Sequence, residues 1–210
     1  MNDTNVRVAL FTEPIGPWAR RISLLMGMSV VVAVFGMSAN SAAVTIGAML
    51  IAPLLEPVLG VGAAIAFVEP SHIARSFVGV LVSAIGAVGL AWLTTLVLVT
   101  NPTLTSEILA RTGTNRGDLV IALAAGATAA WKITNDGEGA SFAGAAIAVA
   151  LVPPLATAGY TLALHRPDLA AGAMALFLVN VAAAVSSSGV VFSLSRRPHG
   201  SPESTCGTSS

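Results

Sequence analysis

The chain has 210 residues, of which 55% are hydrophobic and only 10% are charged. A soluble globular domain carries about 25% charged residues, so this composition excludes an ordinary soluble domain and a disordered chain. Ten basic and ten acidic side chains cancel to zero net charge, which removes the positive field that a nucleic-acid-binding protein needs. The single cysteine, Cys206, excludes a disulfide framework and a cysteine-rich metal site. The sequence therefore predicts an all-α, polytopic membrane protein whose main partner is the lipid bilayer.

Clusters of charge separate six long apolar runs, which we interpret as membrane-spanning helices. A spanning helix needs about 20 mostly apolar residues. The predicted spans are 22–37, 42–68, 72–99, 119–133, 140–164 and 169–194. The fourth run would be only about 22 Å long as a helix, against a hydrocarbon core of about 30 Å, so five spans are the alternative.

The remaining residues and the basic side chains complete the predicted topology. Residues 1–21 form a polar N-terminal arm, 22–194 form the transmembrane domain, and 195–210 form a disordered tail rich in Arg, Ser, Pro and Gly. Six spans would place seven Lys and Arg on one side and three on the other, whereas five spans would divide them evenly. Because basic residues concentrate on the cytoplasmic side, we favour six spans with both termini cytoplasmic.

An internal repeat relates the two halves of the chain. An offset of 97 residues places Gly47–Pro57 over Gly144–Pro154 and gives seven identities among the 24 positions from 47 to 70. The two units, 22–100 and 118–194, would each contain three spans and sit in opposite orientations, which is the 3+3 inverted repeat of many transporters. The alternative is a low-complexity likeness between hydrophobic segments.

Prolines near the middle of the second and fifth spans predict that both helices are broken. Proline lacks an amide hydrogen and disfavours helical geometry in the preceding residue. Backbone carbonyls left without donors at this depth are tolerated only inside protein or against water, where they suit a cation. The pathway residues predicted from these breaks are Met49, Pro53, Pro57, Val149, Ala150, Pro153 and Pro154. A kink that only improves packing is the alternative.

Two polar side chains join this predicted pathway. Glu56 is the only acid well inside a firmly predicted span, and an ionisable group in the membrane is a candidate for ion or proton handling. The alternative is a protonated Glu56 that donates to a neighbouring carbonyl. Asn180 lies in the sixth span, where an amide serves either as a ligand or as a packing contact between helices.

Enzyme and metal signatures are missing from the sequence. The patterns HExxH, GxSxG, Walker A and GxGxxG do not occur. His72, His165 and His199 fall near predicted span ends or in the tail, which places no base beside a nucleophile. We therefore expect no enzymatic activity, no metal site and no cofactor.

Four segments, at 47–57, 117–126, 146–155 and 176–180, carry a resemblance to a known family. In order and spacing they resemble the "domain of unknown function 389" family of hydrophobic prokaryotic proteins, over about residues 20–194. The resemblance implies an integral inner-membrane protein of unassigned activity, with no known cofactor. A glycine is common in that family at the position of Glu56, so the resemblance supports the prolines rather than the glutamate.

We expect a small secondary transporter or channel for an ion or small solute, with its site at the two broken helices. Six short spans are few for a complete carrier, which favours a homo-oligomer and most simply a dimer. The alternative is a non-transporting membrane scaffold or sensor.

Overall fold

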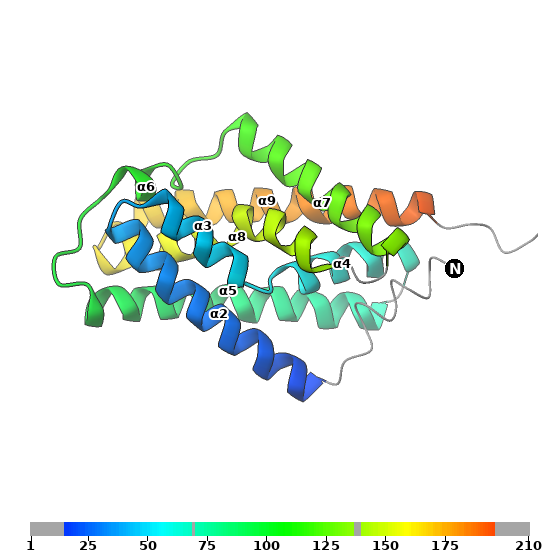
Figure 1. The fold of residues 1–210 in the computed structure, drawn as a ribbon, viewed down its shortest axis with the longest axis horizontal. Helices are drawn as coiled ribbons and strands as arrows, with labels where there is room; N and C mark the ends of the chain where they lie inside the picture. Colours follow the sequence, from blue (N-terminus) through cyan, green and yellow to red (C-terminus); the bar gives the residue numbers. More distant parts are fainter. Residues whose placement is uncertain (1–14, 69, 137–139, 196–210) are drawn as a thin grey trace, which may run out of the picture.

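The computed structural model describes residues 15–68, 70–136 and 140–195, and this part of the chain is helical throughout except for its connections. The helices are α2 (Ile15–Ser38), α3 (Ala42–Ile51), α4 (Leu55–Phe67), α5 (Pro70–Leu98), α6 (Ser106–Leu109), α7 (Arg116–Asp136), α8 (Ala140–Ala163) and α9 (Pro167–Ser195). Figure 1 shows α5 and α9 running in opposite directions along the long axis of the molecule. The predicted all-α class is confirmed. The predicted tail, from 196 onward, lies outside the described residues, whereas α2 begins at Ile15, within the predicted arm.

Three of the described helices are long and apolar enough to cross a membrane: Gly16–Ser38, Pro70–Leu98 and Pro167–Ser195. The segments Ala42–Ile51 and Glu56–Phe67 make a fourth if they form one span bent by 55°. The apolar character predicted for these helices is confirmed, and by length and composition the described residues contain three or four crossings.

The predicted break in the second span is present between α3 and α4. Ala52 adopts an extended backbone, with φ −75° and ψ 125°, because Pro53 follows it. Pro57 then falls in the first turn of α4, where a helix does not use the amide hydrogen that proline lacks. One proline therefore stops α3, and the other is compatible with the start of α4.

The predicted break in the fifth span is wrong. α8 is continuous from Ala140 to Ala163 and contains Pro153 and Pro154 in its interior. This helix contacts α2, α3, α4, α5, α7 and α9, and every residue from 151 to 160 is buried. The two prolines therefore lie inside one continuous helix that other helices surround, the setting in which a proline within a helix is tolerated.

The helix boundaries repeat along the chain at the offset of 97 residues. α5 and α9 both have 29 residues, and each boundary of α9 lies 97 residues after that of α5. Val68 and His165, which precede these helices, adopt the same left-handed backbone, with φ of 57° and 56°. The bent α3–α4 segment corresponds to α8 to within one residue at each end, and α2 corresponds less closely to α7, which begins 101 and ends 98 residues later.

Two glycines allow close helix contacts that obey the same offset. A Cβ at Gly62 would overlap the Ser188 hydroxyl and lie 3.1 Å from the Val185 carbonyl oxygen, on α9. A Cβ at Gly159 would overlap the Val88 carbonyl oxygen and lie 2.8 Å from the Trp92 nitrogen, on α5. Val88 and Val185 are themselves 97 residues apart, so α4 meets α9 as α8 meets α5.

Candidate functional site

Glu56 lies in an ion pair at the start of α4 rather than in an isolated apolar position. Arg21 Nη2 donates to both carboxylate oxygens of Glu56, at 3.0 and 2.9 Å. Trp18 Nε1 donates to Glu56 Oε2 at 3.2 Å. Three hydrogen bonds therefore point at the carboxylate, which is the pattern of an acceptor and not that of a protonated acid donating to a carbonyl.

A second cation extends this arrangement to α5. The guanidinium of Arg75 lies 5.7 Å from the centre of the Trp18 ring, which is within the range of a cation–π contact. Gly79 leaves room for the same ring, because a Cβ there would lie 2.9 Å from Trp18 Cη2. We call Trp18, Arg21, Glu56 and Arg75 the charged cluster. It joins α2, α4 and α5 beside the α3–α4 break.

The other residues predicted at the first break are closely packed. Met49 and Pro57 are buried and Pro53 is half-buried. Pro53 would leave the Met49 carbonyl without a donor in a continuous helix, but at the break this carbonyl accepts the Ala52 amide at 3.3 Å. The extended backbone of Ala52 turns its N–H back towards α3, and this satisfies the carbonyl at the helix end.

The residues predicted on the second half lie on α8 and α9. Pro153 and Pro154 are buried within α8, and Asn180 on α9 is 3% exposed. The backbone of Val149 and Ala150 belongs to α8, whereas their side chains lie outside the described residues. Since α3 and α4 both contact α8, the structure brings the two proline-bearing segments together.

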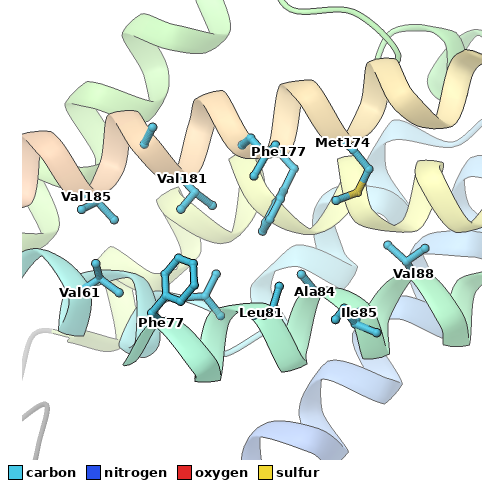
Figure 2. Close-up of a pocket in the computed structure, with 13 residues that line it drawn as sticks. Val61, Phe77, Leu81, Ala84, Ile85, Val88, Met174, Phe177, Val181 and Val185 are labelled. Carbon is cyan, nitrogen blue, oxygen red and sulfur yellow. The ribbon is translucent and has the colours of Figure 1, made fainter. Parts of the chain in front are cut away.

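The structure also contains a groove that the sequence patterns did not indicate. It has a volume of about 590 Å³ and lies between α5 and α9, with Val61 of α4 at one end. The α5 wall consists of Phe77, Val80, Leu81, Ala84, Ile85 and Val88. The α9 wall consists of Met174, Phe177, Leu178, Val181, Ala182 and Val185. Figure 2 shows side chains from both helices pointing into the space between them.

The two walls of the groove are equivalent under the offset of 97 residues. Each α5 residue has its counterpart on α9, beginning with Phe77 and Met174 and ending with Val88 and Val185. Every lining side chain is apolar, and none belongs to the predicted pathway. An alignment of the two long helices at this offset would have been the only sequence signal for the groove.

Metal ligands are not gathered anywhere in the described part of the chain. No group of three or more His, Cys, Asp or Glu side chains there could hold a metal ion.

Comparison with known proteins places the chain in a family. The family model described as "Domain of unknown function (DUF389)" matches residues 49–185, which cover more than half of the chain. No curated protein and no solved structure matches. The match confirms the resemblance noted in the sequence, and with the apolar helices it indicates a membrane protein of unassigned activity. The chain belongs to the DUF389 family.

Proposed function

We propose that this protein is a small secondary transporter or channel for an ion or small solute, without enzymatic activity. It consists of two inverted repeats, α2 to α5 and α7 to α9, each with three crossings. The observation that carries this proposal is the offset of 97 residues, which relates helix boundaries, left-handed residues and glycine contacts in the two halves. Inverted repeats of this kind are typical of transporters.

The helix contacts support the same symmetry. α2 packs on α5 as α7 packs on α9, and α4 packs on α5 as α8 packs on α9. Across the repeats, α4 contacts α9 and α8 contacts α5. Exchanging the two halves therefore converts these contacts into one another, which is the requirement of a pseudo-two-fold axis in the membrane plane.

The proposal makes α7 and α8 crossings as well, for six in total. The 21 residues of α7 extend for about 32 Å as a helix, which matches a hydrocarbon core of about 30 Å. Six crossings would put both termini on the same side of an inner membrane, and the excess of basic residues on that side favours the cytoplasm. A two-fold homodimer is the simplest assembly.

The proposed pathway runs where the α3–α4 break packs against α8. Substrate sites in inverted-repeat transporters lie at the interface between the repeats and use interrupted helices. Two features support this location: the buried prolines of both segments and the charged cluster at the start of α4. Glu56 would change its pairing with Arg21 as the pathway opens and closes.

Ion flux into proteoliposomes tests the proposal. We expect the purified protein to carry at least one of H⁺, Na⁺, K⁺ or Cl⁻, each followed with an ion-sensitive dye inside the vesicles. Glu56→Gln should reduce that flux at least tenfold, because it removes the charge beside the break. Glu107→Gln is the matched control. Glu107 lies in α6, in the connection between α5 and α7, where its carboxylate is 3.6 Å from Arg111. This variant should leave the flux unchanged.

The controls also separate transport from the scaffold alternative. Both variants should elute from size exclusion like the wild type. A correctly assembled wild-type protein that carries none of the four ions would contradict an ion pathway and favour a scaffold or sensor.

A further inference from the structure

The groove lies between α5 and α9, the two longest helices among the described residues. Both of its walls belong to helices that are long and apolar enough to span a membrane. The lining runs from Phe77 to Val88 within Pro70–Leu98, so it occupies the middle of α5 and, by the same offset, the middle of α9. We propose that this groove binds one acyl chain of a membrane phospholipid. The inference requires only that α5 and α9 lie in the bilayer, and it holds whether or not the protein transports.

The charge of the lining identifies the class of ligand. All thirteen lining side chains are apolar, and none carries a charge or a hydrogen-bonding group. A headgroup, an ion or a polar solute in the groove would lose its hydration without receiving hydrogen bonds in return. A neutral alkyl chain has no hydrated polar group and so loses no hydrogen bonds on entering the groove. The groove is therefore complementary to an acyl chain.

The dimensions of the groove suit a single acyl chain. Eleven residue steps along α5 give a length of about 17 Å. The groove offers about 590 Å³ over that length, which is ample for one alkyl chain.

The walls also explain why a chain would stay in the groove. Val80, Ala84 and Phe177 form a buried floor, with 7%, 5% and 3% of their surface exposed. Ile85 and Leu178 form rims that remain 65% and 60% exposed (Figure 2). An acyl chain between the rims would touch protein on several sides, whereas a chain on a flat helix face touches it on one. The groove therefore holds an acyl chain more firmly than a flat helix face does through van der Waals packing, because the lipid chain and the groove have the same polarity.

Photolabelling tests this site in the full-length protein. The protein would be reconstituted into phosphatidylcholine vesicles that contain a small fraction of phosphatidylcholine with a diazirine in the middle of one acyl chain. After illumination, we expect labelled peptides to concentrate at 77–88 and 174–185, at several times the level on other exposed faces of α5. Ala182→Phe, which narrows the groove from an exposed rim, should reduce this labelling at least threefold.

Two further variants keep the test decisive. Ile85→Trp is the counterpart of Ala182→Phe in the other half and should reduce labelling similarly. Val97→Phe changes a residue on α5 that is 67% exposed and outside the groove, so it should have no effect. Labelling that merely follows exposure, or that both groove variants leave unchanged, would overturn the proposal. Coverage of the groove by a second copy, seen as peptides 77–88 and 174–185 that stay unlabelled while other exposed faces of α5 are labelled, would overturn it as well.

Discussion

The two segments that carry the prolines, α3–α4 and α8, occupy corresponding places in the two halves but differ in continuity. Pro57 and Pro154 are 97 residues apart, yet the helix is interrupted only in the first half. In the first half Pro53 follows an extended Ala52, whose amide closes the end of α3. In the second half six neighbouring helices surround α8. Pro53, which stops α3, corresponds to Ala150, so the comparison teaches that the position of a proline within the segment decides whether the helix breaks.

The two halves also differ in the charged residues beside the α3–α4 break and at the corresponding positions of the second half. Glu56 corresponds to Pro153, and its partner Arg21 corresponds to Asp118. The ion pair of the first half therefore has no equivalent in the second, where an apolar proline takes the place of the acid. Corresponding helices have similar bounds in the two halves, whereas the charge beside the break occurs in one half, and this asymmetry would give the proposed pathway a single charged side.

The largest effect that we expect comes from filling the two glycine contacts. Gly159→Ala should lower the free energy of unfolding by about 3 kcal/mol, because its Cβ would meet backbone atoms of α5 that cannot move aside. Gly62→Ala should cost only about 1 kcal/mol, since its closest contact is the Ser188 hydroxyl, which can rotate. Thermal unfolding of the purified protein in detergent measures both.

Gly86→Ala is the control for helix propensity. A Cβ at Gly86 would meet nothing within 4 Å, so this change should stabilise the protein by up to about 1 kcal/mol. If Gly62→Ala and Gly159→Ala lowered the free energy of unfolding equally, the two contacts would be alike in rigidity as well as in position.

The next effect concerns the prolines themselves and should differ in sign between the halves. Pro154→Ala restores an amide in the interior of α8, where proline costs about 3 kcal/mol, and part of this gain is lost to the cavity left by the ring. The net result should be a stabilisation of about 1 kcal/mol. Pro57→Ala gains little in the first turn of α4 and loses buried contacts, so it should destabilise by about 1 kcal/mol.

Unfolding temperatures of these two variants, measured side by side, check the difference. A destabilised Pro154→Ala protein would mean that the ring contributes more to packing in α8 than the missing amide costs. The contrast between the segments would then lie in the cavity and not in the hydrogen bond.

The sequence was sufficient to predict the features that depend on local chemistry. The helices follow from long apolar runs and the first break from Pro53. The offset of 97 residues aligns Pro70 with Pro167, the residues at which α5 and α9 begin. Each of these signals lies within a few neighbouring residues or within a direct comparison of two segments.

The sequence did not predict the features that depend on how helices pack together. The continuity of α8 through Pro153 and Pro154 goes against the local rule for proline. The partner of Glu56 is Arg21, in a stretch that reads as a polar arm, and only the contact between α2 and α4 makes the pair visible. The groove arises because α5 and α9 stand apart, and apolar residues on its walls look like any other lipid-facing residues.

The smallest effect that we expect is the energy of the ion pair itself. Arg21 and Glu56 have 44% and 25% of their side chains exposed, so solvent screens part of their attraction. The two-oxygen geometry strengthens the pair, and a double-mutant cycle with Arg21→Ala and Glu56→Ala should give a coupling of about 1 kcal/mol. The more distant pair Arg111–Glu107, at 3.6 Å, should give about 0.3 kcal/mol in the same detergent. A coupling at Arg21–Glu56 no larger than that of Arg111–Glu107 would mean that the charge does not hold α2 to α4. The asymmetry between the halves would then concern the substrate that passes the break and not the stability of the fold.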